Sequence, residues 1–249
     1  MNAEDSEHIG KQFLKETRPD QLSQPDQQKN VPPPPRSWDL TPKKTYDLPA
    51  PEEIDLPEVD LLETIDSRRS RRSFSEKPLS NEDLSILLYY TQGIQRELSG
   101  EISLRTVPSA GARHAFETMI YLDKATSLPR GIYHYQAEDH SLGLILSGNF
   151  QKEAVRAGLG QNHMAEAAAV FFWVADSYRM EWRYSERAFR YLHLDAGHVC
   201  QNLYLAAEAL DAGVCAIAAY DDDYANKLLN LDGQDNFVIY MAALGFRKN

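Results

Sequence analysis

Cysteine is almost absent from this sequence, and other absences narrow its class further. Its 249 residues include two cysteines, Cys200 and Cys215, too few for a disulfide scaffold or a cysteine-rich zinc site. No uninterrupted apolar run reaches the roughly 18 residues that a membrane-spanning helix needs. Residues 1–10 hold no apolar core of a secretory signal. We therefore expect a cytoplasmic protein with no membrane segment.

Basic residues are also fewer than acidic residues in this chain. The chain has 26 basic and 37 acidic residues, a formal net charge of −11, which argues against general nucleic-acid binding because that depends on clustered positive charge. The glycines form no phosphate-binding loop and no dinucleotide fingerprint. Apolar residues make up 43% of the chain, enough to fill the core of one large domain or two small ones.

Proline is unevenly distributed. Ten of the thirteen prolines lie in residues 1–60, and Pro32–Pro35 predicts extended polyproline II. This leader is either a ligand for a proline-binding module or a spacer or arm lying across the protein surface. We treat residues 1–60 as a wrapping leader and 61–249 as the globular domain. The expected anchors of the leader are apolar: Trp38, Tyr46, Leu48, Ile54, Leu56 and Val59.

The globular part mixes strands and helices without a steady alternation, which favours an α+β fold. Ser80 and Asp221 are predicted N-caps, and Gly213 is the expected stop of the long helix. His198 and the two cysteines are expected to pack in the interior. His193 and His198 are five residues apart on one helix and so lie on different faces, and we do not expect them to bind a metal together. The expected helices are 80–91, 150–157, 194–210 and 224–229, and the expected strands are 118–122, 131–135, 142–146, 169–175, 214–219 and 237–244.

Four arginines within residues 68–72 interrupt the acidic trend. Such a cluster repels itself unless it is solvated, neutralised or bound to an anion. One interpretation is a solvated helix end paired with Glu63, Asp66 and Glu76, and the other is an anion site. Two further segments could contribute to a site: the small residues 108–112, which let backbone amides approach a ligand, and the terminal Arg247-Lys248.

These segments occur in a specific order. Arg-Arg-Ser-x-Arg-x-Phe at 68–74 is followed by Pro-Ser-Ala-Gly-Ala at 108–112 and by Leu-Asp-Ala-Gly-His-Val-Cys-Gln-Asn-Leu at 194–203 with Ala-Ala-Glu-Ala-Leu at 206–210. Tyr-Asp-Asp-Asp at 220–223 and Ala-Leu-Gly at 243–245 close the succession. The succession resembles the nitroreductase family of flavin enzymes, in particular its SagB-type (thiazole/oxazole dehydrogenase-like) branch, over residues 61–249. The resemblance implies a mixed, largely antiparallel sheet flanked by helices, an interlocked homodimer, and FMN bound at the dimer interface.

The resemblance also assigns roles to individual residues. Arg68 and Ser70 match positions that hold the FMN phosphate and ribityl chain, and Arg69 matches a neighbouring position that lines the flavin. Arg72 matches a basic residue at the pyrimidine edge of the ring, where a positive charge stabilises the reduced ring. Arg247 matches the basic residue that completes the phosphate pocket. Each of these residues is therefore expected to bind the cofactor.

Other matched positions lie along the flavin ring. Residues 108–111 (Pro108, Ser109, Ala110 and Gly111) match a loop that packs against the flavin of the other subunit. Ala218 and Ala219 fall where the family's chain passes the isoalloxazine. The stretch before the long helix offers Tyr184 as a group that donates or accepts a proton.

Two departures from the family pattern bear on chemistry. Arg113-His114 stands where many relatives have apolar and aromatic residues, which changes the polarity beside the pocket. Arg183 stands where azoline-oxidising members have a lysine. Because arginine cannot act as a base near neutral pH, this residue argues against azoline dehydrogenation of a peptide.

Three functions follow for the chain. The first is an FMN-dependent oxidoreductase that transfers a hydride between a small organic substrate or NAD(P)H and the flavin, with NADH or NADPH as a transient donor. The second is an NAD(P)H-dependent reductase of nitroaromatics or quinones. The third, from another class, is a flavin-binding accessory protein without turnover, whose leader binds a partner.

Overall fold

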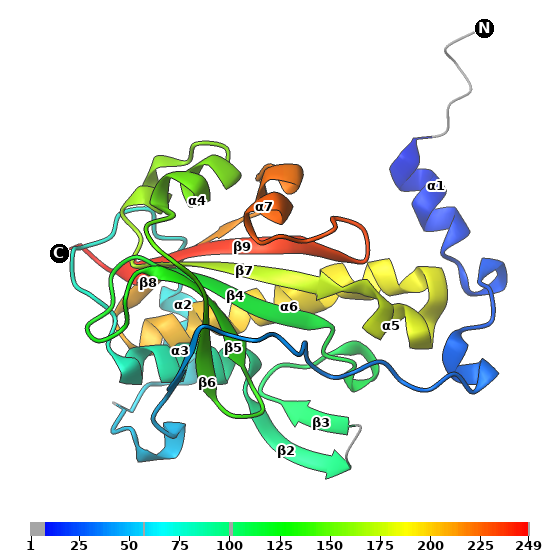
Figure 1. Ribbon diagram of the computed structural model, residues 1–249, viewed down its shortest axis with the longest axis horizontal. Coiled ribbons are helices and arrows are strands. Elements are labelled where there is room, and N and C mark those ends of the chain that lie inside the picture. The colour runs from blue at the N-terminus through cyan, green and yellow to red at the C-terminus, as the bar shows by residue number, and fades with distance from the viewer. Residues whose placement is uncertain (1–7, 57, 100–101, 249) are drawn as a thin grey trace, which may run out of the picture.

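The centre of the structure is a seven-stranded sheet, and every ladder between its described strands is antiparallel (Figure 1). The computed structural model describes residues 8–56, 58–99 and 102–248. The strands lie in the order β1 (Lys44–Asp47), β6 (Ser141–Ser147), β5 (Gly131–Gln136), β4 (Phe116–Leu122), β7 (Ala169–Asp176), β9 (Asn236–Phe246) and β8 (Ala212–Ile217). A separate hairpin joins β2 (Ile94–Ser99) to β3 (Ile102–Arg105).

Helices cover both faces of this sheet. The α-helices are α1 (Ile9–Glu16), α2 (Leu61–Ser67), α3 (Asn81–Gln92), α4 (Gln151–Ala157), α5 (Ser177–Tyr184), α6 (Ala188–Ala209) and α7 (Asp222–Leu228). α3 and α6 pack on one face, and α4 and α7 pack on the other (Figure 1). The predicted α+β class with a largely antiparallel sheet is confirmed.

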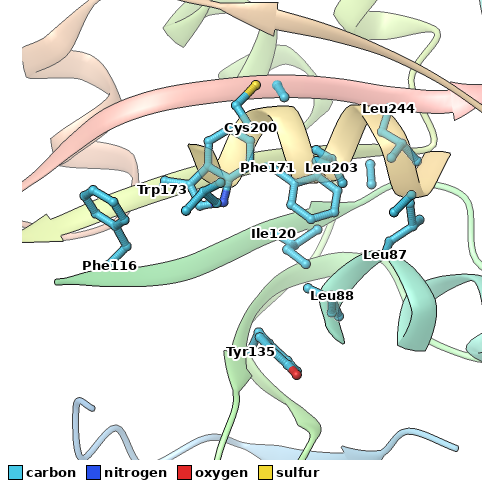
Figure 2. Close-up of a cluster of buried hydrophobic side chains, with 14 of the residues drawn as sticks. Leu87, Leu88, Phe116, Ile120, Tyr135, Phe171, Trp173, Cys200, Leu203 and Leu244 are labelled. Carbon is cyan, nitrogen blue, oxygen red and sulfur yellow. The ribbon is translucent and has the colours of Figure 1, made fainter. Parts of the chain in front are cut away.

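Strand β7 runs through the middle of both cores. Its first seven residues are buried and apolar, and successive side chains of a strand point to opposite faces. Phe171 and Trp173 pack with α3 and α6, and Figure 2 shows them in one cluster with Leu203 of α6. Phe172 and Val174 belong to the second cluster, with α4 and α7. The prediction of a strand buried on both faces is confirmed.

Local signals placed two helix starts correctly. The Ser80 side chain accepts a hydrogen bond from the Asp83 amide, and the Asp83 carboxylate accepts one from the Ser80 amide, which is a complete capping box. The Asp221 side chain accepts from the Tyr224 amide and begins α7. Both predicted N-caps are confirmed.

The long helix differs from the expectation at both ends. α6 begins at Ala188 rather than Leu194, and it ends at Ala209 with a turn at Asp211, whose φ is 54°. Gly213 is not the helix stop, because it lies inside β8. His198 is not an interior packing residue in this chain either, because 51% of its side chain is exposed. Cys200 and Cys215 are buried, as expected.

The leader contributes to the sheet itself. Residues 44–47 form the edge strand β1 beside β6, which the sequence did not reveal. The Tyr46 ring packs on Tyr133 with 6.1 Å between centroids, and Leu48 is buried. Val59 is 53% exposed, so its expected role as an anchor is wrong.

Trp38 is the most strongly bonded anchor of the leader. Its amide donates to Glu117 at 2.9 Å, and its indole Nε1 donates to Asp176 at 3.0 Å. Burial alone would raise the pKa of Glu117, but His134 and Arg179 beside it hold that pKa below the ordinary value. The leader is thus tied to a buried network of charges.

The earlier part of the leader lies on α5 and the start of α6 (Figure 1). The guanidinium of Arg187 donates to the Thr17 carbonyl, that of Arg190 donates to the Thr17 hydroxyl, and the Trp182 indole donates to the Val31 carbonyl. α1 buries none of its own residues. The leader therefore lies against the corner that connects α5 to α6.

Candidate functional site

The arginine segment runs along the free side of edge strand β8. The Arg71 amide donates to the Val214 carbonyl at 2.8 Å, and Ser70 bridges to Val214. A Cβ on Gly213 would lie 2.7 Å from the Arg71 side chain, so only glycine admits this close approach. The sheet edge therefore fixes the backbone of the segment.

Tyr204 of α6 organises the side chains of this segment. Its hydroxyl lies 3.0 Å from the Ser70 hydroxyl and accepts a hydrogen bond of 2.8 Å from the Ala216 amide. The Arg68 guanidinium lies 5.3 Å from the centre of the Tyr204 ring, a cation–π contact. Tyr204 was not among the predicted site residues, although it stands on the apolar face of the predicted long helix.

The positive charge of the segment is not neutralised by carboxylates. Within residues 8–56, 58–99 and 102–248, no ion pair joins residues 68–72 to an acid, and Arg69 donates instead to the backbone carbonyls of Asp66 and Arg68. Glu76 pairs with Lys124. The buried Arg71 Nε has no acceptor. The pairing expected of a solvated helix end is therefore not observed, and the residues present fit a phosphate-bearing cofactor.

The chain end reaches the same region. Arg247 pairs with Glu208 of α6 and donates from Nε to the Ala212 carbonyl at 3.0 Å. Phe74, which follows the arginine segment, bridges to Arg247. The sequence signal for Glu208 was its position four residues after Tyr204, which places both on one face of a helix.

The backbone beyond β8 lies next to these groups. Ala218 and Ala219 are exposed and follow the last residue of the strand, so the predicted strand 214–219 ends two residues early. Burial raises the pKa of the Cys215 thiol, and a hydrogen bond with Arg72 opposes that effect. Arg72 therefore lies at β8, close to the segment where Ala218 and Ala219 were expected to pass the ring.

The Pro108–Ala112 loop is held at a different point of α6. The Ala110 amide donates to the Asp195 carboxylate at 3.0 Å, and the Ser109 hydroxyl accepts from the His114 amide at 2.9 Å. Burial raises the pKa of Asp195, and its bonds with Ser109 and Ala110 oppose the rise. Asp195 was part of the quoted motif, but its role in holding this loop was missed.

Tyr184 and Arg183 lie directly on this loop. Gly111 has a φ of 59°, and a Cβ built there would lie 2.5 Å from the Tyr184 hydroxyl and 2.8 Å from Arg183 Nε. The Tyr184 ring packs edge-on against Tyr191, with 4.7 Å between centroids. The structure therefore brings together the expected flavin loop and the expected proton-transfer residue.

The expected site residues thus form two groups along α6. One group surrounds Tyr204 and the other surrounds Asp195, nine residues away, which corresponds to about 13 Å of helix. Pro108 leads into the second group, and Arg69 lies at the exposed side of the first. An apolar groove of about 440 Å³ between α2, α3 and α6 contains no residue of either group. Among the described residues, no three His, Cys, Asp or Glu side chains are placed to hold a metal ion.

The sequence of this chain matches a known protein family. The sequence profile of the nitroreductase family matches residues 65–246. The chain belongs to the nitroreductase family. Members of this family are flavin-dependent oxidoreductases. In the part of the chain that the structure describes, no helix is long and apolar enough to span a membrane.

Individual proteins similar to this nitroreductase-family chain support the same family. A protein of Methanocaldococcus jannaschii named as a nitroreductase is 33% identical over 177 residues, 71% of this chain and 87% of that protein. A solved nitroreductase of Anabaena variabilis is 34% identical with a TM-score of 0.65, over 74% of this chain and 37% of its own. A chain of the Escherichia coli microcin synthetase McbBCD complex, 18% identical, shares the fold with a TM-score of 0.63, over 97% of this chain and 92% of its own.

A further relative is named for peptide processing. The trifolitoxin-processing protein TfxB of Rhizobium leguminosarum is 26% identical over 75% of this chain. This chain spans about half the length of TfxB, 52%, and 37% of the Anabaena protein.

Proposed function

We propose that this protein is an FMN-dependent oxidoreductase, and the observation that carries the proposal is the arginine segment beside Tyr204. Four arginines and Ser70 lie against a sheet edge with no carboxylate partner in the described chain. A dianionic phosphate with a hydroxylated chain supplies the acceptors and donors that these groups lack. Family membership supports a flavin mononucleotide as the source of that phosphate.

Different residues bind different parts of the cofactor. Arg68 and Ser70 hold the phosphate and ribityl chain, Arg69 lines the flavin beside them, and Arg247 completes the pocket while Glu208 orients it. Arg72 lies at the pyrimidine edge of the ring, close to Ala218 and Ala219. The bound cofactor would supply hydride and two-electron transfer. The protein provides orientation, positive charge and a shaped space above the ring.

The second group of residues completes the site in a homodimer. The Pro108–Gly111 loop and Tyr184 of one copy would face the cofactor held by Arg68 and Arg72 of the other. Exposed apolar side chains along the helices support an interface: Leu194 of α6 is 61% exposed, and Leu62 of α2 is 74% exposed. Size-exclusion chromatography with light scattering tests the dimer, and a Leu194→Glu variant should shift it toward monomer and lose flavin together.

The first substrate pair we propose is NADH or NADPH with a small organic acceptor. A nitroaromatic or quinone acceptor is the second candidate, favoured by the Methanocaldococcus relative named as a nitroreductase. A SagB-type dehydrogenase role has support from the microcin synthetase fold and from TfxB. Arg183 weighs against azoline oxidation because arginine does not act as a general base near neutral pH.

Spectroscopy on the purified full-length protein tests the proposal. We expect flavin absorption in the blue and one FMN per chain on extraction. Mixing with NADH or NADPH in a stopped-flow instrument should bleach that absorption, and oxygen, a quinone or a nitroaromatic should restore it. Absence of flavin overturns the proposal. Flavin that no donor or organic substrate reduces indicates the accessory protein instead.

A further inference from the structure

Arg183 occupies an unusual position at the end of α5. Its guanidinium lies over Gly111, beside the Tyr184 hydroxyl. Within the described residues it has no hydrogen-bond acceptor and no carboxylate, and its ring contact is with Tyr184 at 5.7 Å. The side chain is half-buried, and its guanidinium donors keep access to solvent. It is therefore a candidate for binding a ligand.

The neighbouring arginines are already engaged. Arg113 donates to the Arg179 carbonyl and stacks on Trp182 at 4.7 Å. Arg187 donates to the Tyr191 hydroxyl and to the Thr17 carbonyl. Arg183 differs from both because its donors point to no group of the described chain.

The helix that bears Arg183 is firmly held. Arg179, one turn earlier, is buried and pairs with Glu117 and Asp176. The Asp176 side chain caps the first turn of α5. Such anchoring fixes where the last turn presents its charge, as a preorganised binding group requires.

The backbone around Arg183 is strained on both sides. Ser185, directly after Tyr184, has a φ of 51°, and Gly111, Ala112 and His114 on the facing loop have φ values between 45° and 59°. Left-handed residues other than glycine cost about 1–3 kcal/mol each and concentrate at functional sites. The strained residues of the two segments therefore lie around the point where Arg183 meets Gly111.

We propose that Arg183, with the Tyr184 hydroxyl beside it, binds the carboxylate of a small organic acid as the substrate that exchanges electrons with the cofactor. The guanidinium offers a planar pair of donors that matches a carboxylate in a bidentate pair. Tyr184 supplies one further O–H donor. This inference rests on the proposed function, because Gly111 belongs to the loop expected to line the flavin.

Paired nitroaromatic probes test this preference for an acid. 4-Nitrobenzoate carries a carboxylate, whereas 4-nitrobenzyl alcohol carries a neutral group on the same ring. In either reduction NADH gives a hydride, solvent gives a proton, one N–O bond breaks, and the nitroso product, NAD⁺ and water leave. Steady-state kinetics on the flavin-loaded protein therefore measure the preference directly.

The variants separate charge from structure. Arg183→Met should raise KM for 4-nitrobenzoate roughly 10- to 100-fold, the range for losing a charge-assisted hydrogen-bonded pair. It should change KM for 4-nitrobenzyl alcohol less than about threefold, because no charged pair is lost. Arg183→Lys should recover part of the preference, since lysine keeps the charge but lacks the planar fork. Arg96→Met, an exposed residue of β2, is the matched control and should behave as the wild type.

Two measurements distinguish failure of this inference from failure of the proposed function. Flavin content and bleaching by NADH decide the proposed function. Calorimetric titration with 4-nitrobenzoate decides the inference even without turnover, and binding must weaken in Arg183→Met. Equal binding by the wild type and Arg183→Met, or an equal loss for both probes, overturns it.

Discussion

The hydroxyl of Tyr184 fills the space where Gly111 would carry a side chain, because a Cβ at that position would lie 2.5 Å from the oxygen. Two segments separated by more than seventy residues therefore share one small volume. Gly111 also needs the left-handed region, with a φ of 59°. The contact depends on glycine for both reasons.

The first prediction follows from this contact. Gly111→Ala should lower the free energy of unfolding by more than the roughly 1–2 kcal/mol of left-handed strain alone, because Tyr184 must also move. Gly160→Ala is the matched control: its φ is 77° and nothing lies within 4 Å of the new Cβ. Urea denaturation compares the two variants. Equal losses would mean that Tyr184 does not press on Gly111.

The arginine segment gives the second prediction. Replacing Arg68 and Arg72 together by alanine should weaken FMN binding by about a hundredfold or more, since two charged donors are lost. Fluorescence of released flavin after dialysis measures the effect. Arg96→Ala removes an exposed charge elsewhere and should retain the cofactor. Tight retention of flavin by the double variant would refute the assignment of the phosphate site.

Tyr184 gives the third prediction. Tyr184→Phe keeps the ring packed on Tyr191 and removes the O–H that donates or accepts a proton. We expect kcat to fall roughly 100-fold, the lower range for general acid–base catalysis, with flavin content unchanged. The readout is steady-state turnover together with the absorption spectrum. An unchanged kcat would remove Tyr184 from the catalytic step.

The leader gives the fourth prediction. Trp38→Ala removes the indole bond to Asp176 and the packing of the ring, at a cost of about 2–3 kcal/mol. Trypsin should then cleave within the leader faster than in the wild type. Trp38→Phe retains most of the ring packing and the amide bond to Glu117, so it should lie between the two. Identical cleavage rates in all three proteins would show that Trp38 does not anchor the leader.

A buried histidine gives the fifth prediction. Burial, with Arg105 and Arg113 nearby, lowers the pKa of His114 to about 3, from the ordinary value near 6.5. At a pH between these two pKa values, His114 binds a proton in the unfolded chain but not in the folded chain. Stability should therefore fall as pH falls from about 6.5 toward 3, by about 1.4 kcal/mol per pH unit from this group.

Denaturation at several pH values checks this slope. His114→Asn should lose this contribution to the slope. Ser103 is a buried neighbour of His114 and does not titrate. Ser103→Ala should therefore keep the contribution of His114 to the slope. A wild-type slope in His114→Asn would contradict the prediction.

Most of the helices and strands, and one group of candidate site residues, could be predicted from the sequence. A continuous apolar run located β7, because a strand buried on both faces is apolar at every position. Apolar residues at three- and four-residue steps located the body of α6. Ser80 and Asp221 marked helix starts through local hydrogen bonds. The arginine segment predicted an anion site as one of two alternatives, because four like charges in five residues repel each other unless they are solvated, neutralised or bound to an anion.

Which residues meet across the fold could not be predicted from the sequence, because those contacts join distant segments. Gly213 resembles a helix stop locally, but packing of Arg71 on β8 is what requires a glycine there. Tyr204 gained its role from two bonds to distant segments, and β1 formed because β6 offered a free edge. The position of the Arg183 guanidinium over Gly111, with no hydrogen-bond acceptor among the described residues, likewise depends on a long-range contact. The spacing of apolar residues encodes which face of a helix or strand each residue occupies. The contact partner of that residue depends instead on how the helices pack against the sheet.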